Sequence, residues 1–122
     1  MTPLGILLIS GGHERAHYAL VLATAAAALG RPVTLFATNA GLRLLLAERP
    51  LEAEAREAEI TARGVAGIGT LLEAARELGV ALWACEAGLV GEGLAHASLA
   101  PSVEVTGAVS FLTAATGQVV TL

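Results

Sequence analysis

Short apolar runs, separated by stretches with helical spacing, constrain the fold of this chain more than any other feature. Strands are predicted over residues 4–9, 33–37, 80–84, 102–105 and 118–122. Because these runs are continuously apolar rather than alternating, they favour a parallel sheet that helices cover on both faces. The sequence therefore predicts an α/β fold, a three-layer α/β/α sandwich with a five-stranded parallel sheet, built as a single domain over residues 1–122.

The segments between the first strands predict helices. Residues 14–29 carry apolar side chains at helical spacing, and Gly30 with Pro32 supplies a stop signal. A second helix is expected to start over residues 42–47 and to end before Pro50, because proline disrupts a helix interior.

The second half of the chain predicts three further helices. Residues 68–78 form an amphipathic pattern, and a short helix is expected to end near His96. Residues 107–115 are expected to form the last helix, with Thr106 as its cap. Residues 51–64 carry many of the Glu and Arg residues and are expected as a solvated helix or a mobile excursion.

Composition and charge exclude several classes of protein. One cysteine rules out an intrachain disulfide and an all-cysteine zinc site within one chain. The 7 basic residues are all Arg, the net charge is −4, and no basic cluster is present, so no nucleic-acid partner is expected. No signal-peptide pattern is visible at the start of the sequence, which predicts a cytoplasmic protein.

The apolar content of 55% predicts self-association rather than membrane insertion. The mean hydropathy is +0.70, but the longest apolar stretch, residues 18–29, is shorter than the roughly 18 residues that a spanning helix needs. No membrane span is therefore expected. Large apolar patches are unusual on monomers, so the sequence predicts a homo-oligomer.

The single cysteine, Cys85, lies where the third predicted strand ends, just before a glycine-rich segment. Ligands and reactive groups collect at the carboxyl ends of strands in open α/β sheets, which makes Cys85 a candidate nucleophile. The alternative is that Cys85 is a small buried hydrophobe. A helix that begins at Glu86 would favour the thiolate, whereas the carboxylates of Glu86 and Glu92 would oppose it.

Other residues are expected at the same edge of the sheet. The first strand is followed by a glycine-rich loop, which could receive an anion at a helix N-terminus but matches no nucleotide-binding motif. His13 in this loop either borders the site or is a solvent-exposed loop residue. Thr38 and Asn39 follow the second strand and either line the site or form a plain turn. The candidate lining residues are Ser10, Gly11, Gly12, His13, Thr38, Asn39, Glu86 and Gly88.

The stretch His13-Glu14-Arg15-Ala16-His17 matches the H-E-x-x-H pattern of zinc peptidases. Its context does not fit that class, because the motif opens a helix in a small parallel α/β domain. A third ligand would have to come from Cys85, His96 or a glutamate, and none has a recognisable spacing. No metal and no cofactor are therefore predicted, and His17 is expected to be partly packed.

Three stretches resemble the DsrE/DsrF/DsrH-like proteins, and they cover nearly the whole chain. The first is AAAALGRPVTLFAT followed by Gly41-Leu42. The second is LLEAARELGV followed by Ala84-Cys85-Glu86, which resembles the DsrE-like branch. The third, VEVTGAVSFL, is similar to the closing strand and helix of that branch.

This resemblance implies a sulfur-relay protein, sulfurtransferase-like if it is active. A cysteine at the position of Cys85 would carry a persulfide between a sulfur-donor protein and an acceptor protein. The resemblance also implies a trimer or hexamer, with the trimer favoured. Relatives often continue with a Met-rich segment where this chain has residues 87–91. The competing interpretation is a non-catalytic oligomeric module that binds a small ligand or a protein at the same edge.

Overall fold

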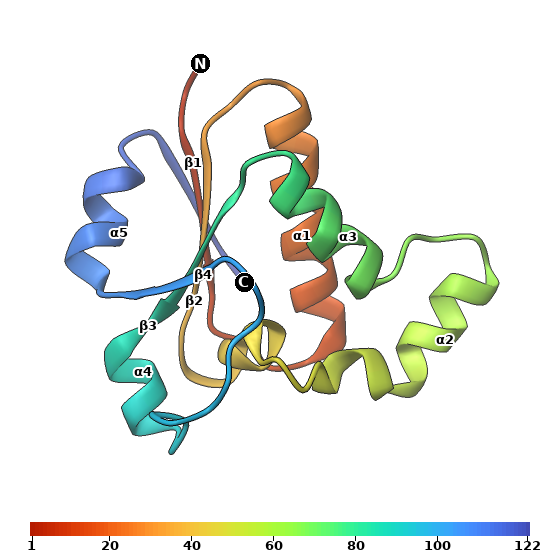
Figure 1. Cartoon of the computed structure of the whole chain (residues 1–122). Coiled ribbons are helices and arrows are strands. Elements are labelled where there is room, and N and C mark those ends of the chain that lie inside the picture. Colours follow the sequence, from red (N-terminus) through yellow and green to blue (C-terminus); the bar gives the residue numbers. More distant parts are fainter.

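A five-stranded, all-parallel sheet forms the centre of the protein (Figure 1). The computed structural model describes all 122 residues, and the strand order in the sheet is β4-β3-β2-β1-β5. This confirms the predicted α/β fold and its five-stranded parallel sheet. The strands are β1 (Leu4–Leu8), β2 (Val33–Ala37), β3 (Ala81–Cys85), β4 (Val103–Thr106) and β5 (Gln118–Thr121).

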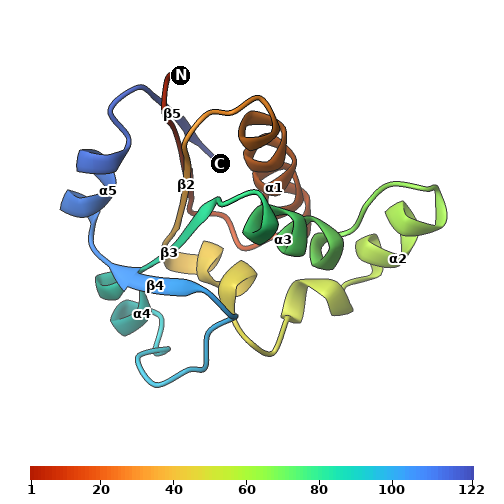
Figure 2. The same cartoon turned by 45° about the horizontal axis from the view of Figure 1, so that its top comes forward.

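Helices cover the two faces of the sheet unequally. In Figures 1 and 2, α1 and α3 lie on one side of the sheet and α5 lies on the other. A core cluster of 22 buried residues fills the α1/α3 side, whereas the cluster under α5 has only 4. The helices are α1 (His13–Ala28), α2 (Ala55–Ala62), α3 (Ile68–Glu77), α4 (Glu86–Gly91) and α5 (Ala108–Ala114), with two 3-10 helices, η1 (Asn39–Leu45) and η2 (Pro50–Ala53).

The first and last strands are neighbours in the sheet. Leu4 of β1 pairs with Val33 of β2 on one side and with Gln118 of β5 on the other. The outer strands β4 and β5 contain no buried residue, and each has a partner strand on one edge only. They therefore differ from the fully covered strands that the apolar runs predict.

Two predicted features of the first half were wrong in detail. The helix expected over residues 42–47 is the 3-10 helix η1, in which Leu42, Leu44 and Leu45 are all buried. Such close spacing of buried side chains does not fit one stripe of an α-helix. Pro50 begins η2 rather than ending the previous helix, in agreement with the tolerance for proline in a first helical turn.

Two predicted features of the second half also differ. The helix expected to end near His96 is α4, which ends at Gly91, and Gly93 follows with a φ of +72°. Thr106 is the last residue of β4 and does not cap α5. The N-cap position of α5 is occupied by Gly107. The excursion over residues 51–64 contains η2 and the helix α2, and α2 has no buried residue.

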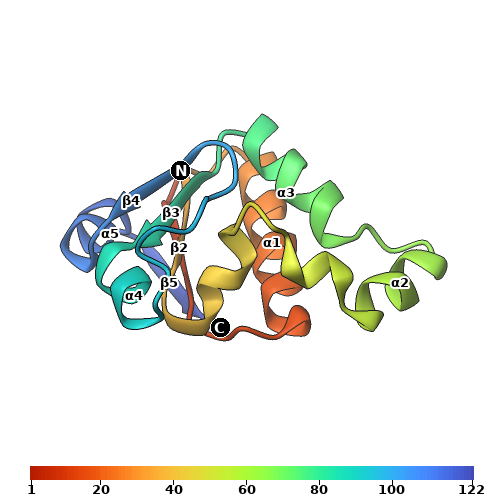
Figure 3. The same ribbon diagram turned by 60° about the horizontal axis from the view of Figure 1, so that its bottom comes forward.

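The helix α2 lies at one end of the molecule, and α4 and α5 lie at the other (Figure 3). None of the helices has the length and apolar character needed to cross a membrane.

Candidate functional site

Cys85 lies at the carboxyl end of β3 and is followed directly by α4. The helix begins at Glu86, so the sulfur is placed beside the first turn of backbone N–H groups. The N–H of Gly88 donates a hydrogen bond to Sγ of Cys85 over 3.4 Å. The sulfur therefore has one hydrogen-bond donor directed at it from the first turn of α4.

Cys85 belongs to a small apolar cluster on the face of the sheet that α5 covers. Cys85 belongs to the same cluster as Phe36, Phe111 and Ala115, and only 9% of the residue is exposed. The rings of Phe36 and Phe111 stack with their centroids 5.0 Å apart. Cys85 therefore lies at the carboxyl edge of the sheet, as one interpretation of the sequence expects, and it is buried, as the other expects.

Thr38 and Gly88 lie beside the cysteine. A Cβ atom built on Gly88 would be 2.5 Å from Oγ1 of Thr38 and 3.3 Å from Cβ of Cys85. The absence of a side chain at Gly88 thus lets α4 approach β2 closely. Asn39 follows with a left-handed φ of 50°, and its Oδ1 accepts a hydrogen bond from Thr38 Oγ1 over 3.2 Å.

The glycine-rich loop after β1 lies further away, because β2 separates β1 from β3. No hydrogen bond or ion pair joins Ser10, Gly11 or Gly12 to Cys85. The carbonyl of Gly11 accepts a hydrogen bond from Nη1 of Arg43 over 2.6 Å. The structure thus brings Cys85, Glu86, Gly88, Thr38 and Asn39 together, and it packs the first loop against η1.

His13 is turned toward α2 and is 4% exposed, so the alternative of a solvent-exposed loop residue is wrong. Its Nε2 donates a hydrogen bond to Oε1 of Glu57 over 2.7 Å. The same carboxylate accepts from the backbone N–H of Ile68, at 3.1 and 3.0 Å to its two oxygens, and so caps the N-terminus of α3. His13, Glu57 and Ile68 form a polar cluster that joins three helices.

Burial pushes the pKa of Glu57 upward, but the hydrogen bonds from His13 and from the backbone of Ile68 and Gly69, together with attraction to His13, outweigh it. The pKa of Glu57 therefore lies below its ordinary value, and the carboxylate form is favoured.

The two histidines of the H-E-x-x-H stretch do not converge on a metal. Their rings stack with centroids 5.7 Å apart, and Nε2 of His17 donates to the carbonyl of Ala66 over 2.8 Å. Both Nε2 atoms are therefore engaged in hydrogen bonds. No group of three or more metal-ligating side chains is arranged to hold an ion.

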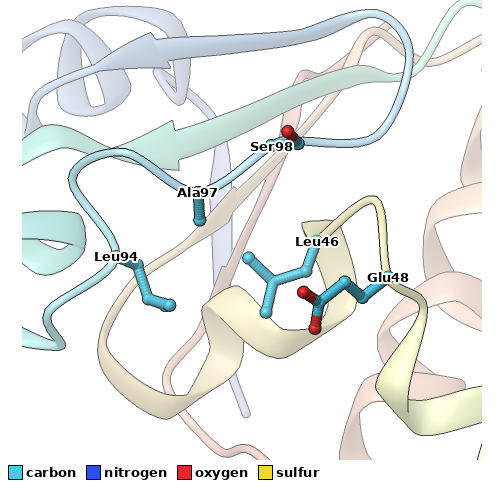
Figure 4. Close-up of a pocket in the computed structure, with 5 residues that line it drawn as sticks. All are labelled: Leu46, Glu48, Leu94, Ala97 and Ser98. Atoms are coloured by element: carbon cyan, nitrogen blue, oxygen red, sulfur yellow. The ribbon is translucent and has the colours of Figure 1, made fainter.

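A cavity of about 170 Å³ lies between the end of η1 and the segment after α4 (Figure 4). Two leucine side chains and the carboxylate of Glu48 line it. Cys85 lines none of the cavities of the protein, so the sulfur has no preformed pocket beside it. The lining residues are Leu46, Glu48, Leu94, Ala97 and Ser98.

Comparison with known proteins identifies the family. The model of the DsrE/DsrF-like family matches residues 4–119. The chain belongs to this family. Among solved structures, the crystal structure of the YchN protein from E. coli is similar over 100% of both chains, with a TM-score of 0.75 and 20% sequence identity. At that identity, the likeness shows the shared fold alone. No curated protein matches the chain.

Two side chains of this DsrE/DsrF-like protein were not anticipated from its sequence. Glu57 was placed only in a charged excursion, and its partner His13 is 44 residues away. Arg43 was placed in a predicted helix, although it contacts both Gly11 and, at 3.6 Å, Glu54. Neither pair has a local sequence signal, because both contacts depend on how distant segments fold together.

Proposed function

We propose that the protein is an intracellular sulfur carrier that holds a persulfide on Cys85 and passes the outer sulfur between partner proteins. Membership of the DsrE/DsrF-like family supports this function. The observation that carries it is the place of the single cysteine at the carboxyl end of β3, with the N–H of Gly88 directed at Sγ. The Gly88 N–H contacts Sγ, the atom that attacks the persulfide of the sulfur-donor protein and that leaves as a thiolate when the acceptor takes the outer sulfur.

The reaction needs no net oxidation or reduction. The Cys85 thiolate attacks the outer sulfur of a donor persulfide, a new S–S bond forms, and the donor leaves as a thiolate. An acceptor thiolate then attacks the outer sulfur on Cys85. The bond between the two sulfurs breaks, the acceptor becomes the persulfide, and Cys85 is restored as a thiolate.

The carrier is proposed to be a homo-oligomer, with a trimer favoured. Val90 of α4 is 66% exposed and follows Cys85 closely in sequence, and Val105 of β4 is 49% exposed and pairs with Ala84 beside Cys85 in the sheet. Their burial against a neighbouring copy would remove apolar surface from water and place the subunit boundary near the sulfur. A neighbouring chain would then supply a cation or histidine beside Cys85.

Light scattering over a wide concentration range tests this assembly. Val90→Glu should reduce the particle mass, whereas Val109→Glu, on the outer surface of α5, should leave it unchanged. A stable monomer of the unaltered protein at micromolar concentration contradicts the proposal.

A second candidate function is a non-catalytic module that binds a small ligand or a protein at this edge. The burial of Cys85 favours it, because a cysteine that serves only in packing needs no exposed sulfur. The cavity between the end of η1 and the segment after α4, lined by Leu46 and Leu94 and by the carboxylate of Glu48, offers space for a ligand.

Incubation with a persulfide donor, followed by intact mass measurement with and without reductant, separates the two functions. A carrier gains sulfur that reductant removes, and the Cys85→Ser variant gains none. If no donor adds sulfur to the unaltered protein, the binding module is the better description.

A further inference from the structure

The cavity between the end of η1 and the segment after α4 has walls that backbone contacts hold in place (Figure 4). The two segments meet in an antiparallel bridge between Leu46 and Leu99. Next to this bridge, the N–H of Ala47 donates a hydrogen bond to the carbonyl of Ser98 over 2.9 Å. Both contacts join segments that lie far apart in sequence. The space between the segments is therefore formed before any ligand arrives, as is usual for small-molecule sites.

Most of the cavity lining is apolar. Leu46 and Leu94 are only partly buried, and their side chains extend toward one another across the cavity (Figure 4). Ala97 adds a small apolar side chain. Partly exposed apolar walls favour a ligand that covers them with carbon. A cavity of about 150 Å³ can bind benzene, with its six carbon atoms, so the space of about 170 Å³ suits a short aliphatic chain.

The only charged group in the lining is the carboxylate of Glu48, which has no partner in the protein. Glu48 takes part in none of the ion pairs. The neighbouring Arg49 pairs with Glu52 instead, and no basic residue lines the cavity. The lining also contains the hydroxyl of Ser98, which can accept a hydrogen bond. A free carboxylate beside apolar walls suits a ligand that has a cationic end and an apolar stem.

The other cavities of the protein do not combine these properties. Two of them are lined by Arg31, and the remaining one is lined by Arg49 and Arg76. Each therefore places at least one guanidinium group at its wall, which disfavours a cationic ligand. The cavity beside Glu48 is the one whose charge and apolar lining fit such a ligand.

We propose that this cavity binds a primary alkylammonium group, with the ammonium beside Glu48 and the carbon chain between Leu46 and Leu94. Two sources present this group: a free short-chain amine and the lysine side chain of another protein. Both are positively charged at neutral pH, since the pKa of such an amine is about 10.4. The proposal gives a ligand class to the second candidate function and does not depend on persulfide transfer at Cys85.

Titration of the isotope-labelled protein with n-butylammonium chloride, followed by the NMR shifts of the backbone amides, tests the site. The shifts should concentrate on the residues that line the cavity and should saturate with a Kd in the millimolar range. Binding this weak is expected, because the ligand is small and its ion pair is partly exposed. Sodium butyrate should give no saturable shift, since its carboxylate would face Glu48. Sodium chloride controls for ionic strength.

Two variants separate binding in the cavity from attraction at the surface. Glu48→Gln should weaken n-butylammonium binding about threefold to fivefold, whereas Glu77→Gln, at an exposed position without an ion pair at the end of α3, should leave the Kd within about 1.5-fold. Ala97→Leu fills part of the cavity and should abolish saturable binding, although it retains Glu48. Glu48 and Ala97 are exposed, so both variants should fold.

A second probe, N-acetyl-lysine methylamide, separates the two sources of the alkylammonium group. Saturable shifts of the same amides with this compound identify a lysine side chain as a ligand, and their absence identifies a free amine.

Four results would overturn the site. They are the absence of a saturable shift with n-butylammonium, equal binding of butyrate, an unchanged Kd in Glu48→Gln, and an unchanged Kd in Ala97→Leu. The readout requires no sulfur donor. A protein that takes up persulfide sulfur on Cys85 but fails this test is a carrier without the alkylammonium site, so the failure of one proposal is distinct from the failure of the other.

Discussion

Glu57→Gln removes the charge at the centre of the polar cluster that holds α2 to the domain. The Glu57 side chain is 14% exposed and accepts hydrogen bonds from Nε2 of His13 and from the N–H of Ile68. Because α2 itself buries no residue, these contacts replace apolar packing. Glutamine keeps the size of the side chain but offers one acceptor atom in place of two, so one donor faces its amide nitrogen.

The expected loss of stability is about 1 to 2 kcal/mol. Hydrogen bonds to a charged group contribute about 1.5–3 kcal/mol and those between neutral groups about 0.5–1.5 kcal/mol. A change of that size lowers the melting temperature of a domain of this length by roughly 3–10 °C.

The loss should depend on pH. Burial raises the pKa of Glu57, but the hydrogen bonds from His13 and Ile68 outweigh it, so the folded-state pKa is lowered. A lowered pKa stabilises the protein above the unfolded-state value, about 4.3 for Glu, and this contribution disappears as pH falls through the folded-state pKa. The difference between Glu57→Gln and the unaltered protein should therefore be full at neutral pH and shrink below about pH 4.

Urea unfolding at fixed protein concentration, followed by the fluorescence of Trp83, measures this difference. Glu59→Gln is the matched control, because Glu59 is exposed on the same helix and makes no hydrogen bond or ion pair. Equal losses in the two variants, or a Glu57→Gln difference that persists unchanged at pH 3, would refute the reasoning.

Three further predictions follow from other contacts. Gly88→Ala should cost about 1–3 kcal/mol in urea unfolding, because its Cβ meets Thr38 and the backbone of Asn39, while Gly91→Ala has open space and should be neutral. Glu73→Gln should change stability by less than about 0.5 kcal/mol, since Glu73 is 64% exposed beside Arg76, and a larger loss contradicts this. Elemental analysis should find no stoichiometric zinc, and zinc that disappears in His17→Ala would contradict that expectation.

The sheet could be predicted because buried parallel strands leave a direct mark on the sequence. The second strand was predicted over the same residues, 33–37, that β2 occupies. Cys85 was placed at a strand end because the apolar run stops there, and the helix considered at Glu86 is α4. In each case the signal is local, since apolar runs and stop residues act over a few positions.

The contacts that depend on tertiary structure could not be predicted. The sequence around His13 is compatible with either a buried or an exposed side chain. What decides is the contact with Glu57, which is distant in sequence and forms a hydrogen bond with His13. The 3-10 geometry of η1 follows from leucines that pack on the sheet, which overrides their high helix propensity. The packing of Phe111 over Gly5 joins residues that lie far apart in sequence.

The pairing of β1 with β5 has a consequence for synthesis of the chain. Residues 118–121 leave the ribosome after β1 and β2, so a growing chain in which β1 pairs with β2 carries an open backbone edge along β1 until β5 emerges. Exposed strand edges attract other chains, which makes this interval the one most prone to aggregation. A chain that stopped before Gln118 would leave Ile6 and Leu8, which are fully buried here, on an edge strand.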